Sequence, residues 1–341
     1  MAPTETPTVM SAARIHRMGD PDAIVIDSVA VPAPGPGEIL VAVRSAAVNF
    51  PDTLMIAGKY QVQVPLPFVP GHEAAGVVHA VGPGVTAPVP GDRVAVLAPG
   101  AFAEYVVAPA TAAVPILDTV GFDEAAATWV CHLTAYHALR STAEIASGEM
   151  VLVLGAGGGV GLAAVELATI LGGRVVAAAS SADKLEAARS RGAEFTVDYS
   201  ATDLRTGVRE AIGSGSVDIV IDPVGGTLSE QALREMRWGG RFVTLGYASG
   251  HIPQIPLNLV LLKGVDIRGL EIRTFASRAP GRAERDRAEF TDLWASGRIR
   301  PVIGARYPLD QVSAALNTVA AGRSLGKTVI EMAPSPHTED C

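Results

Sequence analysis

The sequence contains only two cysteines, Cys131 and Cys341, among its 341 residues. Two cysteines are too few for a disulfide framework or for a four-cysteine metal site. No apolar run approaches the about 18 residues that a membrane-spanning helix needs, and the N-terminus lacks the basic start and apolar middle of a secretory signal. We therefore expect no membrane partner and a reducing, cytoplasmic location.

Positive charge and aromatic side chains are also scarce. Asp and Glu outnumber Lys and Arg by 35 to 27, which gives a formal net charge of −8, and only 5% of the residues are aromatic. Nucleic acid binding requires a concentrated positive field, so we expect no nucleic acid partner. Any site for a phosphate group has to be built locally.

The length and the changing texture of the chain predict two domains of an α/β protein. Residues 1–124 contain short β-rich runs broken by Gly and Pro, such as EILVAVRSAAVN, which predict a mostly β domain. In residues 125–271, apolar strands such as MVLVLG and VDIVIDPVG alternate with helices, which predicts a doubly wound parallel sheet of six strands, the Rossmann arrangement. Residues 272–341 are too few for a third domain and are expected to return to the first.

A glycine-rich segment follows the first strand of the predicted parallel sheet. The order MVLVLG, AGGGVG and an apolar helix is the one a dinucleotide site requires. Ala156, Gly158 and Gly161 are expected to form the tight turn, admit the pyrophosphate and allow close helix packing, while backbone amides receive the phosphate charge. The predicted pyrophosphate-binding residues are Ala156, Gly157, Gly158, Gly159, Val160 and Gly161. The alternative is a glycine-rich turn without a ligand.

The end of the second strand predicts which nucleotide is bound. NAD sites usually carry Asp or Glu there, about 20 residues after the glycine turn, but this segment reads RVVAAASSADK and has Ala179 at that place. A 2′-phosphate can sit among the hydroxyls of Ser180 and Ser181 and the ammonium group of Lys184. Tyr199, just beyond the third strand, either lends its hydroxyl to the same phosphate or covers the sheet edge. NADPH is therefore favoured over NADH.

Several motifs in both halves of the chain carry a family resemblance. They are VNFPD, a Gly-x-Tyr turn before PLPFVPG, GHE, LTAYHAL, AGGGVG, DPVGG and GKTV. With them the chain resembles the quinone oxidoreductase branch of the medium-chain dehydrogenase/reductase family over nearly its whole length. The resemblance implies a GroES-like N-terminal catalytic domain, a Rossmann domain that binds NADPH, and reduction of a quinone or a similarly activated carbonyl acceptor.

The chain departs from the zinc alcohol dehydrogenases of the same family. Their catalytic zinc is held by a Cys, the His of the GHE motif and a later Cys, whereas this chain has no Cys before Cys131 and no four-cysteine lobe after GDRV. A trio of His72, Cys131 and His132 is conceivable, but we predict no metal site and read His72 and Glu73 as hydrogen-bonded or paired structural residues. Without zinc, hydride delivery to an already activated acceptor is favoured over alcohol oxidation.

The resemblance also implies individual site residues. Asn49 and Asp52 are expected to line the cleft beside the nicotinamide, and Tyr60, or an ordered water, to position or protonate the developing oxyanion. The structural alternatives are that Asp52 caps a helix and that Asn49 bonds neighbouring backbone. Three further residues are expected to flank the cofactor: Gly246, Tyr247 and Asn258.

Two other functions remain open from the sequence. One is an NADPH-dependent enoyl reductase, which adds hydride to an α,β-unsaturated ketone, acid or thioester. A thioester would need a basic groove, which four arginines could form, although a flexible charged loop is the simpler interpretation: Arg273, Arg278, Arg282 and Arg285. The other is a non-catalytic NADPH-binding protein.

The last predicted strand of the parallel sheet, VDIRGLEI, leaves a sheet edge that has to be paired or covered. Joining this strand to its copy in a second subunit would satisfy both edges at once. We therefore expect a homodimer that forms through the edge of the Rossmann sheet.

Overall fold

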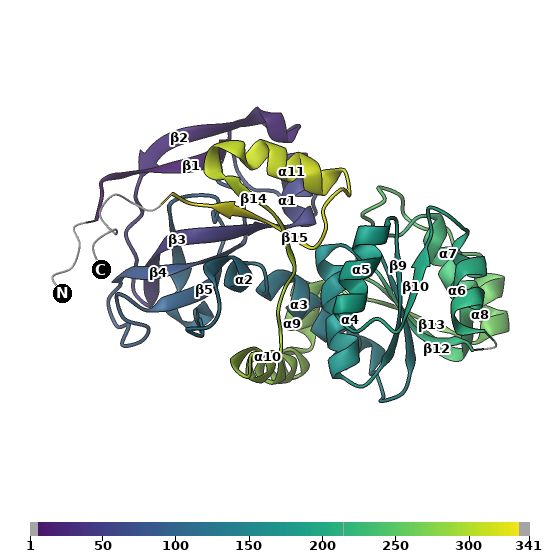
Figure 1. Cartoon of the computed structure of the whole chain (residues 1–341). Helices are drawn as coiled ribbons and strands as arrows, with labels where there is room; N and C mark the ends of the chain where they lie inside the picture. The colour runs from purple at the N-terminus through teal and green to yellow at the C-terminus, as the bar shows by residue number, and fades with distance from the viewer. Residues whose placement is uncertain (1–5, 214, 334–341) are drawn as a thin grey trace. The chain divides into compact units, whose positions relative to one another are not determined.

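The computed structural model describes residues 6–213 and 215–333, which form two compact units (Figure 1). The first unit contains the described residues up to Val130 and those from Ile303 onward, and the second runs from Cys131 to Val302. The expected boundaries at 124 and 271 differ from this division. Residues 272–302 belong to the nucleotide-binding unit, and only the segment that begins at Ile303 returns to the first unit.

The first unit is a mostly β, GroES-like domain. A two-stranded sheet pairs β1 with β2, and a larger sheet has the order β14-β15-β3-β4-β5-β7, with β6 also paired to β3. Its strands are β1 (Val9–Ile15), β2 (Ile24–Ala30), β3 (Glu38–Val48), β4 (Glu73–Val81), β5 (Arg93–Leu97), β6 (Tyr105–Pro109), β7 (Val114–Pro115), β14 (Ile303–Pro308) and β15 (Lys327–Glu331). Its helices are η1 (Pro21–Ala23), α1 (Phe50–Ile56), η2 (Ala110–Ala112), α2 (Phe122–Ala126), η4 (Leu309–Gln311) and α11 (Val312–Ala320).

The second unit is a Rossmann domain. Its strands are β8 (Met150–Leu154), β9 (Arg174–Ala179), β10 (Phe195–Asp198), β11 (Val217–Asp222), β12 (Met236–Thr244) and β13 (Asp266–Gly269). Its helices are η3 (Ala138–Ala143), α4 (Gly159–Ile170), α5 (Ala182–Ser190), α6 (Leu204–Ile212), α7 (Thr227–Glu235), α8 (Leu257–Lys263), α9 (Ile272–Arg278) and α10 (Pro280–Ala295). Helix α3 (Trp129–His137) begins just before the division between the units.

The sheet of the second unit confirms the predicted doubly wound order. The strands run β10-β9-β8-β11-β12-β13, and every neighbouring pair is parallel. Helices α4 and α5 cover one face and α6, α7 and α8 the other, as Figure 1 shows. The winding reverses between β8 and β11, and in such sheets ligands bind at the carboxyl ends of the two strands that flank the reversal. The loops that follow Leu154 and Asp222 therefore flank the expected ligand site.

The charged segment near residue 280 corrects one prediction. The expected flexible loop is helical, with α9 ending at Arg278 and α10 beginning at Pro280. Proline is tolerated in the first turn of a helix because the N–H that it lacks has no helical partner there, so the Arg-Ala-Pro-Gly segment marks a helix start.

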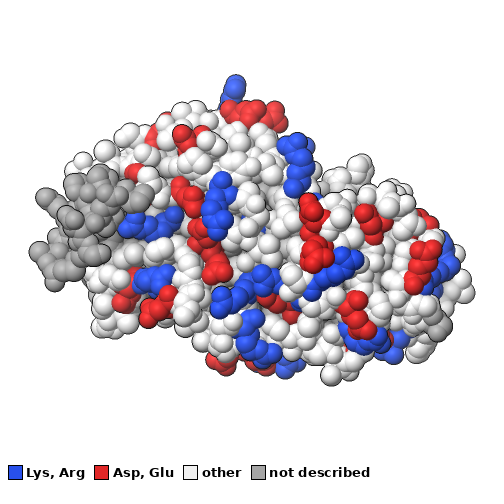
Figure 2. All heavy atoms as spheres, in the orientation of Figure 1, with Lys and Arg blue, Asp and Glu red and all other residues white. Residues whose placement is uncertain are grey.

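The distribution of surface charge and the length of the helices bear on whether nucleic acid or a membrane could be a partner. On the face drawn in Figure 2, Lys and Arg side chains are interspersed with Asp and Glu, so this face has no large patch of one sign. None of the helices in the described part of the chain is long and apolar enough to cross a membrane.

Candidate active site

The glycine-rich turn after β8 is built so that helix α4 packs directly against it. Gly155 has φ +60°, and a Cβ atom on Gly161 would lie 2.1 Å from the carbonyl oxygen of Gly155. The N–H of Gly158 donates to the carbonyl of Gly155 at 3.0 Å, so the tight turn contains Ala156, where the sequence placed it. Gly158 precedes the first turn of α4, so the N–H groups of this turn point to a site that suits an anionic pyrophosphate.

Lys184 lies over this turn. A Cβ atom built on Gly157 would meet Cβ and Cγ of Lys184 at 2.4 Å, so the lysine stem runs along the glycine backbone. Lys184 is in the first turn of α5, which Ser181 precedes as N-cap residue. Partial burial lowers the pKa of the Lys184 ammonium group. Burial destabilises the charged form of Lys184, and an anion bound beside the ammonium group would stabilise that form again.

Two hydroxyl groups, those of Ser180 and Tyr199, follow the carboxyl ends of the neighbouring strands β9 and β10. Ser180 directly follows β9 and hydrogen-bonds the side chain of Tyr199, whose backbone N–H donates to the carbonyl of Ala179 at 3.1 Å. Burial is the main reason why the pKa of the Tyr199 hydroxyl is raised, so this group stays protonated and can donate. Ala179, where an NAD site would carry its carboxylate, is fully buried. The residues present therefore fit a phosphorylated ribose.

The loop after β11 lies beside the switch point, the place between β8 and β11 where the winding of the sheet reverses. The Asp222 carboxylate accepts hydrogen bonds from the N–H groups of Val224 and Gly225, both at 2.8 Å, and from the Ser229 hydroxyl at 2.5 Å. Burial raises the pKa of Asp222 despite these donors. The loop touches the glycine turn, because a Cβ on Gly155 would lie 2.6 Å from Val224 Cγ2.

The segment after β12 is hydrogen-bonded to that loop. Ala248 N–H donates to Pro223 O at 3.1 Å, Ser249 N–H to Val224 O at 2.9 Å, and Gly226 N–H to His251 O at 2.9 Å. Two of the residues expected to flank the cofactor, Gly246 and Tyr247, therefore lie beside the switch point, and Tyr247 contacts the space above Gly225. The third, Asn258, is an exposed residue of α8.

In the first unit, two of the expected catalytic residues, Asn49 and Asp52, belong to a buried polar network. The Asn49 side chain donates to Glu73 Oε1 at 2.9 Å and accepts from Lys327 Nζ at 2.6 Å. Lys327 also forms an ion pair of 2.8 Å with Glu73, and both side chains are almost fully buried. Glu73 Oε2 accepts from the backbone N–H of Val130 at 2.8 Å. Lys327, which the sequence reasoning did not single out, closes this network.

Asp52 caps a helix, which was the structural alternative to a catalytic role. It is the third residue of α1, and its Oδ2 accepts from the backbone N–H of Asn49 at 2.8 Å, which caps the helix. Its Oδ1 lies 2.8 Å from Nδ1 of His72, so the same buried carboxylate also orients the imidazole. His72 is thus a hydrogen-bonded residue, as expected, and Tyr60 is a partly exposed residue four positions after the end of α1.

The conceivable zinc ligands have other neighbours in the structure. His132 Nε2 lies 3.1 Å from the Glu166 carboxylate, which also accepts from Arg191 and from the backbone N–H of Arg300. Cys131 is buried. Within residues 6–213 and 215–333, no three or more His, Cys, Asp and Glu side chains are grouped to hold a metal ion.

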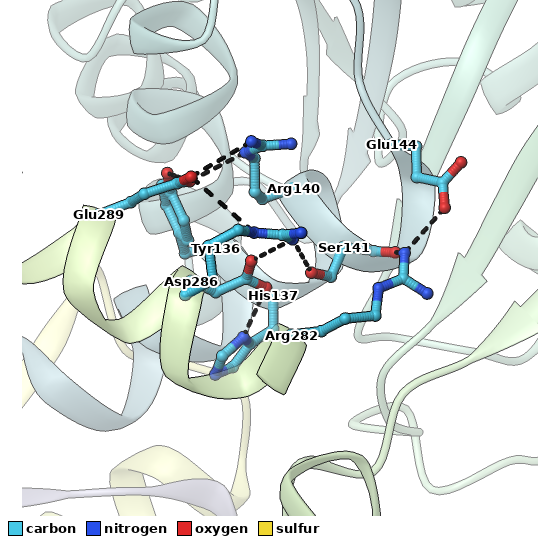
Figure 3. Close-up of polar contacts among 9 residues, drawn as sticks. Tyr136, His137, Arg140, Ser141, Glu144, Arg282, Asp286 and Glu289 are labelled. Atoms are coloured by element: carbon cyan, nitrogen blue, oxygen red, sulfur yellow. Dashed lines mark hydrogen bonds and ion pairs between the residues drawn. The ribbon is translucent and has the colours of Figure 1, made fainter. Parts of the chain in front are cut away.

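Figure 3 shows where Arg282 of the α9–α10 segment points. Arg282 reaches the carboxylate of Glu144 at 2.8 Å and the carbonyl of Ser141, and Arg285 donates to the Ser141 hydroxyl and to Asp286, each at 2.7 Å. These contacts fasten α10 to η3, the turn of π-helix whose last carbonyls need donors.

The neighbours of those arginines reinforce the same attachment. His137 Nδ1 lies 2.9 Å from Asp286, and the Tyr136 hydroxyl donates to Glu289 at 2.8 Å. Burial favours the neutral form of Asp286, but hydrogen bonds from His137, Ser141 and Arg285 outweigh it and lower its pKa. This cluster attaches α10 to α3 and η3 within the second unit. It engages Arg282 and Arg285, two of the four arginines that a phosphate-binding groove would need.

Comparisons with known proteins agree with both units. The chain matches the alcohol dehydrogenase GroES-like domain over residues 35–118 and the zinc-binding dehydrogenase domain over residues 159–283. Mouse quinone oxidoreductase-like protein 2 is 36% identical over 311 residues, which cover 91% of this chain and 89% of that protein. Among solved structures, a mycobacterial protein complexed with NADPH is 33% identical with a TM-score of 0.85, covering 94% of this chain and 99% of that one.

A second solved structure is the Escherichia coli quinone oxidoreductase complexed with NADPH. It is 28% identical, has a TM-score of 0.85, and covers 94% of this chain and 99% of that one. The chain belongs to the medium-chain dehydrogenase/reductase family, whose members of this kind are oxidoreductases. Within the family it lies in the quinone oxidoreductase branch, as its motifs predicted.

Proposed function

We propose that this oxidoreductase uses NADPH to reduce a quinone or a similarly activated carbonyl acceptor, without a catalytic zinc ion. The observation that carries the nucleotide assignment is the corner formed by Lys184, Ser180 and Tyr199 over Gly157, at a strand end that has Ala179 in place of a carboxylate. Two structures similar to this chain were solved with NADPH. Support for the quinone comes from the names of relatives and from the motifs.

The chemistry divides between the cofactor and the chain. When bound, NADPH supplies a hydride from its nicotinamide ring. The chain binds the pyrophosphate on the N–H groups that precede α4 and fixes the ribose phosphate with Lys184. In this proposal Tyr60, or a water beside it, positions or protonates the oxygen that gains charge on the acceptor. Asn49 and Asp52 act as positioning residues, because their polar atoms are engaged by Lys327, Glu73 and His72.

The independence of zinc is part of the same proposal. It rests on the absence of any cysteine before Cys131, so that the first thiolate ligand of a zinc alcohol dehydrogenase has no counterpart. A quinone needs no Lewis acid to accept a hydride, since its carbonyls are already activated. The low cysteine content also supports the cytoplasmic location that we propose.

Enoyl reduction is the nearest competing activity. A thioester of a phosphorylated carrier would need free basic side chains, but Arg282 and Arg285 bind Glu144, Ser141 and Asp286. The arginine segment therefore gives this alternative less support than its sequence suggested, and small enones remain its better substrates.

An acceptor panel tests the function. We expect NADPH oxidation, followed by its absorbance, with ortho- and para-quinones, at rates unchanged by a chelator, and slower turnover with enones and enoyl thioesters. Higher rates with enoyl thioesters than with any quinone would assign the enzyme to enoyl reduction. Binding of NADPH without turnover of any acceptor would identify a non-catalytic binding protein.

Lys184 provides a second prediction. A Lys184→Ala variant is expected to bind NADPH more weakly by about 1–3 kcal/mol, because a charge-assisted hydrogen bond to the 2′-phosphate is lost. NADH binding should change much less. Arg189→Ala, on the same helix but with its guanidinium on Glu186 and Thr196, is the matched control and should leave both affinities unchanged. Fluorescence titration of the parent and both variants with NADPH and with NADH gives the six dissociation constants. Equal weakening of both nucleotides by Lys184→Ala would refute the assignment.

The oligomeric state belongs to the proposal as well. We expect a homodimer formed through β13, which is the outermost strand of the parallel sheet and has β12 as its neighbour. An open edge of this kind is a template for pairing with another chain.

A further inference from the structure

Asp222 is a buried carboxylate whose hydrogen-bond partners are all neutral. It is the last residue of β11, and its side chain is fully buried. Its oxygens accept hydrogen bonds from the N–H groups of Val224 and Gly225 and from the Ser229 hydroxyl. Burial raises the pKa of Asp222, and the groups that lower this pKa again are the same three donors. No charged side chain of the described residues is among the groups that shift it.

This environment sets Asp222 apart from the other buried carboxylates of the described residues. Burying an ionised carboxylate costs free energy, which an opposite charge beside it normally offsets. Four other buried carboxylates lie 3.2 Å or less from a nitrogen of a basic side chain: Glu73 from Lys327, Glu166 from Arg191, Asp286 from Arg285 and Asp52 from His72. The second unit therefore places a negative charge at Asp222 without a positive charge of its own beside it.

The order of the strands relates Asp222 to the two ends of a bound dinucleotide. The sheet runs β9-β8-β11-β12 through its centre. In the proposed nucleotide site, the ribose phosphate lies at the carboxyl end of β9 and the pyrophosphate at the glycine turn after β8. A dinucleotide that crosses the switch point then extends its other half, the nicotinamide, toward the carboxyl ends of β11 and β12. Asp222 forms the carboxyl end of β11.

The loop that surrounds the Asp222 carboxylate is fixed on several sides. Gly225 and Gly226 have φ +73° and +64°, which other residues rarely adopt. Gly226 N–H donates to His251 O at 2.9 Å, and the Val224 side chain lies against Gly155 of the glycine turn. The negative charge therefore has a set position before a nucleotide binds, and a charge held in this way needs no reorganisation when a reaction begins.

We propose that the Asp222 carboxylate stabilises the positive charge that the nicotinamide ring acquires when it gives up hydride. In that step the bond between C4 and the transferred hydrogen breaks, its electron pair leaves with the hydrogen to the acceptor, and the ring becomes a pyridinium cation. At an effective dielectric constant of about 20, opposite charges about 10 Å apart attract strongly enough to change an equilibrium constant about tenfold. Asp222 can therefore act through its field, without touching the ring. This role rests on the NADPH binding of the proposed function but not on its acceptor.

A comparison of NADP⁺ with NADPH tests this role, because the two nucleotides carry the same phosphates and differ in the charge of the nicotinamide. We expect Asp222→Asn to raise the ratio of the NADP⁺ Kd to the NADPH Kd about tenfold at neutral pH, since the amide oxygen still accepts from the loop but the charge is gone. Ser229→Ala removes a neutral donor and keeps the charge, so its ratio should equal that of the parent protein. Asp203→Asn, the same change at the exposed N-cap of α6, should alter neither affinity. Fluorescence titration without acceptor measures every constant.

The ratio separates a role of the charge from a role in the shape of the loop. A folded Asp222→Asn protein with the ratio of the parent would overturn the proposal, even if both affinities fall, because equal losses indicate loop structure alone. If Asp222→Asn does not fold, the double variant Asp222→Asn/Ser229→Ala replaces it with the same expected ratio, since its amide no longer meets the serine hydroxyl. A parent protein that binds neither nucleotide would overturn the NADPH site and this role together. Failure of the quinone assay with normal nucleotide binding leaves the comparison valid.

Discussion

A Lys327→Met variant is expected to lose about 3–5 kcal/mol of its free energy of unfolding. The Lys327 side chain is 3% exposed, and its ammonium group compensates the charge of the Glu73 carboxylate, whose side chain is only 1% exposed. Without the lysine, the buried Glu73 carboxylate has no opposite charge beside it, and breaking a buried pair from one side costs an amount of this order. Urea unfolding of the variant and the parent protein measures the difference.

Two further variants separate the ion pair from the loss of packing. Glu73→Gln combined with Lys327→Met should be at least as stable as Lys327→Met alone, because the double variant has no uncompensated charge. Lys59→Met, the same change at an exposed lysine, should stay within about 0.5 kcal/mol of the parent. If the double variant loses the sum of what Lys327→Met and a Glu73→Gln single variant each lose, the ion pair is not what stabilises this core.

Replacing Gly161 with alanine is expected to damage both stability and nucleotide binding. The new Cβ would lie 2.1 Å from Gly155 O and 2.8 Å from Ala156 Cα, and both are backbone atoms that have no rotamer to change. Helix α4 would have to move away from the turn, at a cost of about 1–3 kcal/mol for overpacking. Because the displaced amides are those that we propose bind the pyrophosphate, NADPH affinity should fall by about tenfold or more.

The matched control is a glycine on another helix of the same unit. Gly281 lies in the first turn of α10 with nothing within 4 Å of an added Cβ, so Gly281→Ala should keep NADPH affinity and leave stability equal or up to about 1 kcal/mol higher. Parallel titrations with NADPH and urea decide the question. A Gly161→Ala protein that binds NADPH as tightly as the parent would show that the turn does not hold the pyrophosphate.

Much of the fold follows from local patterns. The six apolar strands of the Rossmann sheet and the helix after AGGGVG were predictable, because buried parallel strands and a glycine turn leave a signal within about ten residues. The tight turn was expected at Ala156, which lies between the hydrogen-bonded residues Gly155 and Gly158. The prediction of a loop for the arginine segment was wrong, because Pro280 was taken as a loop residue although it begins α10.

The buried network of the first unit could not be found in this way. Lys327 and Glu73 are 254 positions apart, and their contact depends on β15 pairing with β3. No spacing rule connects such residues, and a lysine in a short GKTV strand looks like an exposed one. The corner of Lys184, Ser180 and Tyr199 was accessible because all three lie at the ends of neighbouring strands or in the first turn of α5, where the Rossmann order brings them together.

The central claim is that a hydride passes from NADPH to a quinone without help from a metal ion. The most direct measurement compares the rate of acceptor reduction with NADPH and with NADPH deuterated at C4, in the presence and absence of a strong chelator. We expect deuterium to slow the chemical step in single-turnover experiments, by the same factor with and without chelator. A rate that vanishes when the chelator is added, or NADPH that binds but is never oxidised by a quinone, would contradict the account.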